Sequence, residues 1–175
     1  LMMFVWVLFL LFTLSCVSFS PLDPPSHLLV TYSDNAPIHN WCGSIGAHIA
    51  YLAMQRIGPG VFVGIVLLGI AMVIWTRGDE VTQLPLRIIG AAMLVACLST
   101  FFNLTGRPDP FGEGAGGMLG ISLGTFLHLK FGVSAWMFLT FGFVVGALLA
   151  ADEFVLALPA RLLWLGKRLP TDHLA

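Results

Sequence analysis

One glycine-containing segment occurs twice in this chain, at an offset of 74 residues. Each copy places three glycines at the same intervals: Gly43, Gly46 and Gly58 in the first copy, and Gly117, Gly120 and Gly132 in the second. A long apolar run precedes each copy and another follows it. The pattern predicts two copies of one unit, built from a membrane helix, an outer loop, a short glycine-edged helix and a second membrane helix.

The composition is typical of a bilayer protein. Hydrophobic residues make up 58% of the chain and charged residues 10%, whereas a soluble domain has about 25% charged residues. Four segments approach the ~20 residues that cross a bilayer: residues 1–18, 60–75, 86–102 and 133–151. Each can satisfy its backbone hydrogen bonds internally only as a helix. We therefore expect an all-α integral membrane protein with four transmembrane helices and an internal two-fold sequence repeat.

Two further segments, residues 43–57 and 118–131, are too short to span, and we expect each to form an amphipathic helix on the outer surface. Small residues let helix backbones approach closely within a membrane. On that ground we assign structural packing roles to eight positions: Gly43, Gly46, Ala50, Gly58, Gly117, Gly120, Gly124 and Gly132. A second stripe of small residues is expected to form a helix–helix interface, with a partner inside the chain or in another copy: Gly142, Gly146 and Ala150.

Basic residues predict the orientation, because cytoplasmic loops carry an excess of Lys and Arg. Five lie on one predicted side: Arg77, Arg87, Arg161, Lys167 and Arg168. Three lie on the other: Arg56, Arg107 and Lys130. We expect both ends of the membrane domain, residues 1–151, to face the cytoplasm, with repeat units at about 1–76 and 86–151. Residues 152–175 then form a cytoplasmic juxtamembrane segment and the start of a linker, and the apolar first residues predict that further chain precedes them.

One pattern points to catalysis. Gly120-Ile-Ser122-Leu-Gly124 matches G-x-S-x-G, in which the serine occupies a sharp strand-to-helix turn. No strand pattern precedes Ser122, so we favour packing glycines and keep an intramembrane serine hydrolase as an alternative. A second alternative is a small-solute transporter or channel built on a duplicated two-span unit. Such proteins usually place an ionisable residue within a span, and none lies deep within these spans.

Cofactor and metal sites are not predicted. His27, His39 and Cys42 lack the spacing of a zinc site. The P-loop pattern G-x-x-x-x-G-K-[ST] is absent from the sequence. No basic patch of the kind that contacts nucleic acid is present. We therefore expect no catalytic residue, cofactor, metal or direct nucleic-acid contact in this chain, and the lipid bilayer as its main partner.

The segment from Asn40 to Leu52, with Gly43, Gly46, Ala47 and Ala50 at fixed spacing, resembles the N-terminal four-helix membrane region of FtsK/SpoIIIE DNA translocases. Gly90 in the third span, and Gly116-Gly117-x-x-Gly120 with Gly132, continue the resemblance over about residues 1–151. It implies a bacterial inner-membrane anchor for an ATP-driven DNA pump that acts in chromosome segregation at the division septum. It also implies a motor located beyond Ala175, a homo-oligomer matching a hexameric motor, and contacts with other division proteins.

Overall fold

The computed structural model describes residues 2–23, 38–78, 83–106 and 115–150. Within these ranges the chain forms helices and no strands. In chain order the elements are α1 (Met2–Val17), α2 (Gly43–Arg56), α3 (Gly60–Arg77), α4 (Leu84–Leu104), α5 (Gly117–Phe131), the 3₁₀ turn η1 (Gly132–Ser134) and α6 (Ala135–Ala150). These bounds differ by at most two residues from the segments expected from the sequence.

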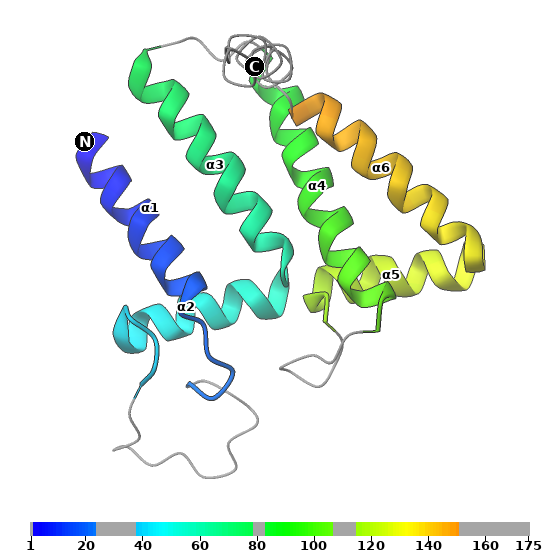
Figure 1. Cartoon of the computed structure of the whole chain (residues 1–175), viewed down its shortest axis with the longest axis horizontal. Coiled ribbons are helices and arrows are strands. Elements are labelled where there is room, and N and C mark those ends of the chain that lie inside the picture. Colours follow the sequence, from blue (N-terminus) through cyan, green and yellow to red (C-terminus); the bar gives the residue numbers. More distant parts are fainter. Residues whose placement is uncertain (1, 24–37, 79–82, 107–114, 151–175) are drawn as a thin grey trace, which may run out of the picture.

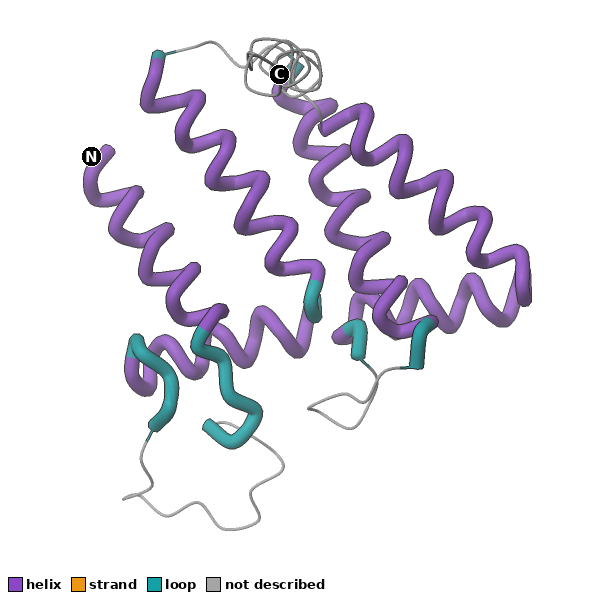
Figure 2. The backbone as a smooth tube through the Cα atoms, in the orientation of Figure 1, coloured by secondary structure: helices purple, strands orange, loops and turns teal. Residues whose placement is uncertain are grey.

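Four of the helices run alongside one another and two lie across them (Figure 1). The long helices α1, α3, α4 and α6 are neighbours in that order, and α2 and α5 cross beneath one end of them. The start of α1, the end of α3, the start of α4 and the end of α6 all lie at the opposite end. Each half of the chain therefore follows the same path of a long helix, a crosswise helix and a second long helix (Figure 2).

The long helices have the apolar composition of membrane spans. Among the described residues, three helical stretches are long and apolar enough to cross a bilayer: α3, α4 and the continuous stretch from Gly117 to Ala150. The apolar helix α1 is shorter, with 16 residues. Large apolar side chains such as Val66, Ile88 and Phe141 are exposed on these helices. Helices that are apolar on all sides are typical of membrane spans, so the structure fits the expected all-α membrane protein.

Local sequence accounts for where the helices end. Gly78 follows α3 with φ of +77°, and its N–H donates to the Trp75 carbonyl at 3.1 Å. Glycine adopts this left-handed conformation without the strain that a side chain would add. Pro85 lies in the first turn of α4, where its missing N–H removes no intrahelical hydrogen bond. This proline explains why α4 begins two residues before the expected span.

A small apolar core ties the first half together. Cys16 of α1, Met54 of α2, and Val61 and Ile65 of α3 form one buried cluster. Phe9 and Phe12 of α1, and Phe19 just after it, pack around the cluster. In the second half, α4 lies between α5 and α6 and contacts both. Several other close contacts between helices are made at glycines.

Candidate functional site: the glycine helix crossings

The two halves of the chain meet backbone to backbone where α2 ends and α5 begins. Gly58 and Gly117 both have positive φ, +75° and +64°. A Cβ added to Gly117 would lie 2.6 Å from the Gly58 nitrogen and 2.8 Å from the Met54 carbonyl oxygen. A Cβ added to Gly58 would overlap the carbonyl group of Gly116. Neither position has room for a side chain, so the contact between the halves depends on glycine on both sides.

A serine of α4 reinforces this junction. The Ser99 hydroxyl donates to the carbonyl of Ile57, the residue that follows α2, at a distance of 2.5 Å. Ser99 is fully buried, at 0% exposure. The same hydroxyl would be overlapped by a Cβ on Gly60, which begins α3. Ser99 therefore joins the second half of the chain to the α2–α3 corner of the first.

The crossing of α5 over α4 rests on a row of glycines. A Cβ at Gly120 would overlap the Ser99 carbonyl oxygen and lie 3.2 Å from the Thr100 nitrogen. A Cβ at Gly124, one turn further along α5, would meet the Asn103 amide, with 3.2 Å to its Cγ. Gly116 likewise faces the Ser99 carbonyl and the Asn103 Cβ. The α5 backbone thus lies directly against the last turns of α4.

The crossing of α2 against α1 uses the equivalent glycine. A Cβ at Gly46 would lie 2.6 Å from the Asn40 Oδ1 and 3.2 Å from the Ser15 Oγ. The Ser15 hydroxyl donates to the Gly46 carbonyl. Asn40, at 4% exposure, donates from Nδ2 to the Ser15 carbonyl at 2.9 Å and accepts from the Cys42 N–H at 3.0 Å. Each hydrogen-bonding group at this crossing therefore has a partner.

The two crossings pair the same residue types. Gly46 and Gly120 are 74 residues apart, and each lies against a serine near the end of the preceding long helix. The serines differ in their acceptors, because Ser15 bonds within its own half and Ser99 bonds to Ile57 in the other half. Sequence reasoning missed both serines and Asn103, and it named Asn40 only as part of the family pattern. The serines and Asn103 could have been found as polar residues at or near the end of an apolar run that precedes a glycine segment.

Two of the eight glycine and alanine positions differ from the expectation. No atom lies within 4 Å of a Cβ built on Gly43 or Gly132. Both have positive φ, +66° and +56°, and they stand at the entry of α2 and the exit of α5. Their glycines serve a backbone turn rather than a close approach of helices. Ala50, by contrast, is fully buried, at 0% exposure.

The small-residue stripe of α6 faces α4 of the same chain. A Cβ at Gly146 would lie 3.1 Å from the Met93 Cβ, and one at Gly142 would lie 3.0 Å from the Cys97 Sγ. On α4, a Cβ at Gly90 would lie 2.8 Å from the Gly146 carbonyl oxygen and would overlap the Ala150 nitrogen. The stripe formed by Gly142, Gly146 and Ala150 therefore has its partner inside the chain, and Gly90 is the residue that completes it.

The residues with catalytic or metal-binding chemistry do not converge. The Ser122 hydroxyl donates to the Met118 carbonyl of its own helix at 2.7 Å and is exposed. No hydrogen bond joins Ser122 to a histidine in the part of the chain that the structure describes. Among those same residues, no group of three His, Cys, Asp or Glu is placed to hold a metal. His27 lies outside the described residues, and the Cys42 thiol contacts the Leu11 carbonyl at 3.4 Å.

His39 instead helps to close the base of the loop between α1 and α2. Buried Asp23 accepts the backbone N–H of His39 at 3.0 Å and that of Asn40 at 2.9 Å. The His39 Nδ1 lies 3.2 Å from the same carboxylate. These bonds bring the residues on either side of 24–37 together. The histidine therefore has a structural partner, and the carboxylate holds the segment just before α2.

Comparison with known proteins gives one clear relationship. No curated protein and no solved structure matches the chain significantly. A family model described as the 4TM region of DNA translocase FtsK/SpoIIIE matches residues 1–163. The match covers every described helix and extends past α6, and it confirms the resemblance seen at the first glycine segment. The chain belongs to the family of 4TM membrane regions of the DNA translocase FtsK/SpoIIIE.

Proposed function

We propose that this chain is the membrane anchor of an FtsK/SpoIIIE-type DNA translocase acting in chromosome segregation and cell division in a bacterial inner membrane. The observation that carries the proposal is the family match over residues 1–163. Its geometry suits an anchor, because the described helices are held together by backbone contacts and internal hydrogen bonds. The motor would follow the last residue of this chain, so the ATPase activity would belong to the longer protein.

The proposed topology has four spans, α1, α3, α4 and α6, with α2 and α5 on the outer face. Two features support it. The ends of α3 and α4 that share one face carry Arg77 and Arg87, and basic residues favour the cytoplasmic side. Gly46 and Gly120, which lie at the two helix crossings, are related by the 74-residue offset, and this relation supports two copies of one two-span unit. Both ends of the domain would then face the compartment that holds DNA.

We extend the proposal to a homo-oligomer. The family's motor is hexameric, so several anchors would lie side by side in the membrane and could contact one another or other division proteins. In solution measurements, the purified chain should then elute from a sizing column with more than one copy per micelle. A strictly monomeric chain at every concentration would contradict this part of the proposal and leave the anchoring role intact.

Localisation and complementation test the proposed function. The test uses a bacterium whose translocase has lost its own membrane region and keeps only its motor. The chain would be fused to this motor and to a fluorescent protein. We expect bands at the division septum and fewer chromosomes trapped there. The matched controls are the same motor on an unrelated four-helix membrane protein, and the chain without a motor. Uniform envelope fluorescence, equal to that of the unrelated anchor, would contradict the septal role.

A further inference from the structure

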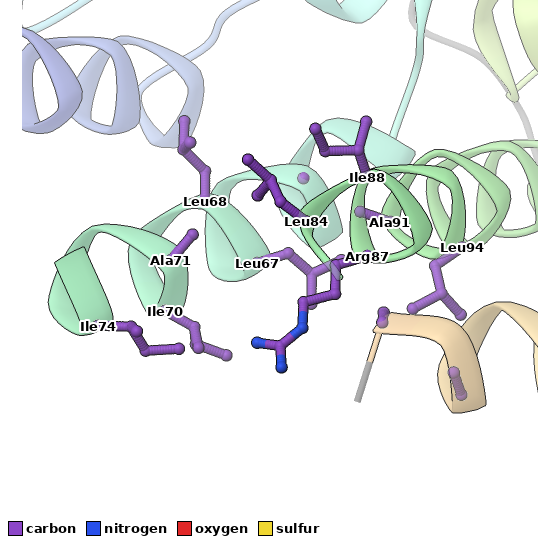
Figure 3. Close-up of a pocket in the computed structure, with 13 residues that line it drawn as sticks. Leu67, Leu68, Ile70, Ala71, Ile74, Leu84, Arg87, Ile88, Ala91 and Leu94 are labelled. Carbon is purple, nitrogen blue, oxygen red and sulfur yellow. The ribbon is translucent and has the colours of Figure 1, made fainter. Parts of the chain in front are cut away.

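A groove lies between α3 and α4, on the side of the molecule where both helices reach their charged ends. Its volume is about 410 Å³ and its wall is almost entirely apolar, with residues from α3, α4 and the end of α6. Leu67, Ala71 and Ile74 line it from α3, and Ile88 and Ala91 line it from α4 (Figure 3). Pockets that hold small molecules have about 300–1,000 Å³ and a mostly apolar wall with a few polar groups.

The polar group in this groove is cationic and lies at one end. Arg87 lines the groove from the first turn of α4, and its side chain projects toward the side formed by α3 (Figure 3). Arg77 follows Ile74 by three residues, which places it on the same face of α3, just beyond the groove. The groove therefore has a basic end, with an apolar wall running away from it.

The length of the groove matches one leaflet of a bilayer. Its lining residues run from Gly64 to Ile74 on α3 and from Leu84 to Leu94 on α4. Ten residues of helix are about 15 Å long, which is half of the ~30 Å hydrocarbon thickness. A molecule with an anionic head and an apolar tail of that length is complementary to such a groove in both charge and shape.

We propose that this groove binds an anionic phospholipid, with one acyl chain between α3 and α4 and the phosphate held by Arg87. Basic pockets between membrane helices are known to take anionic head groups. Arg87 has a further interaction within the chain, and the five N–H donors of a guanidinium allow it to serve a phosphate as well. The site is independent of which membrane face the groove opens toward, and of the DNA-translocase function.

Water and a helix of a second copy are two other candidate occupants. Water would find almost no hydrogen-bonding partners on the wall, and apolar cavities stay dry. A helix of a second copy, packed against the apolar wall, would bring no phosphate to the basic end of the groove, and the oligomer measurement below distinguishes it from a lipid. Asp79 and Glu80, in the connection between the two helices, lie outside the described residues. Their negative charge would oppose that of Arg87. A comparison of anionic with zwitterionic lipid therefore measures the net electrostatic attraction of this end of the groove for a phosphate.

Native mass spectrometry of the purified full chain would test the site. Dioleoyl phosphatidylglycerol and dioleoyl phosphatidylcholine, which share their acyl chains, would be titrated into the detergent solution. We expect tighter binding of phosphatidylglycerol, and a loss of about fivefold in Arg87→Gln, since a basic residue near anionic lipid contributes ~1 kcal/mol. Arg56→Gln, which makes the same change at an exposed position of α2, is the control and should bind as wild type. If Arg87→Gln does not fold, Arg77→Gln replaces it, with the same direction expected.

A second pair of variants tests the acyl chain. Ala91→Leu would fill the groove, whereas Ala92→Leu adds the same side chain to an exposed position outside it. We expect Ala91→Leu alone to reduce phosphatidylglycerol adducts. Equal affinity for the two lipids, equal losses in Arg87→Gln and Arg56→Gln, or unchanged adducts in Ala91→Leu would each overturn the proposal. Loss of an oligomer in Ala91→Leu with adducts retained would assign the groove to a second copy instead.

Discussion

Alanine at position 120 should force α5 away from α4. A Cβ there would overlap the Ser99 carbonyl oxygen and lie 2.6 Å from the Ser99 carbonyl carbon, whereas carbon atoms in optimal contact are about 3.5–4.0 Å apart. The obstacle is backbone and cannot turn aside by a rotamer change, so the helices must separate by roughly 1 Å. Overpacking of this kind typically lowers the free energy of unfolding by about 1–3 kcal/mol.

Gly64 of α3 offers a matched control. A Cβ there would meet only the Val95 Cγ2, at 3.6 Å, which is ordinary van der Waals contact. Both changes replace a glycine inside a helix, and alanine is the better helix former by about 1 kcal/mol. That gain is common to the two variants and cancels in the comparison. Gly120→Ala should therefore be less stable than Gly64→Ala by about 1–3 kcal/mol.

Equilibrium unfolding in mixed micelles of rising SDS fraction, followed by tryptophan fluorescence, measures this difference. The midpoint of Gly120→Ala should shift to lower SDS, and that of Gly64→Ala should equal or exceed the wild type. Equal midpoints for the two variants would refute the reasoning, because α5 would then not rest on the backbone of α4.

Three further substitutions probe the polar groups at the crossings. Ser99→Ala removes the bond to the Ile57 carbonyl between the two halves and should lower stability by about 0.5–1.5 kcal/mol in the same titration; an unchanged midpoint would mean that the bond does not hold the halves together. Asn40→Ala leaves the buried Ser15 carbonyl and the Cys42 N–H without this partner, so a loss of about 1–3 kcal/mol is expected, with Ser44→Ala on the exposed face of α2 as a neutral control. Ser122→Ala should stay within about 0.5 kcal/mol of wild type and keep septal localisation, since its hydroxyl bonds only its own helix; a stable variant that lost an activity of the wild type would restore the hydrolase alternative.

The course of the helices could be predicted because it depends on local properties of the sequence. The length of an apolar run and the absence of charge indicate a membrane helix whatever its neighbours are. The observed bounds agree with the apolar runs to within two residues. Two of the remaining differences lie at Gly78 and Pro85, which mark the end of α3 and the start of α4 and were not used to set the expected ends.

The role of each glycine could not be predicted, because one residue type serves two physical needs. Gly120 is required where backbones touch, whereas Gly132 is required where φ is positive and the surrounding space is open. Both occur in the same repeated pattern. The residues that the glycines contact could not be predicted either. Ser99 and Gly90 both belong to α4, an apolar run in which the sequence does not indicate which face contacts α5 and which contacts α6.

An anchor can serve a DNA motor only if the end of α6 faces the compartment that holds DNA, so the orientation of the helices is the most direct test. Single cysteines would be placed in a chain without Cys16, Cys42 and Cys97, and labelled in intact cells with a membrane-impermeant maleimide. Ser44 of α2 and Lys130 of α5, which are exposed and polar, should be labelled from outside as cysteines, and position 79 only after the membrane is opened. Labelling of position 79 in intact cells, with protection of position 44, would contradict the proposed anchor.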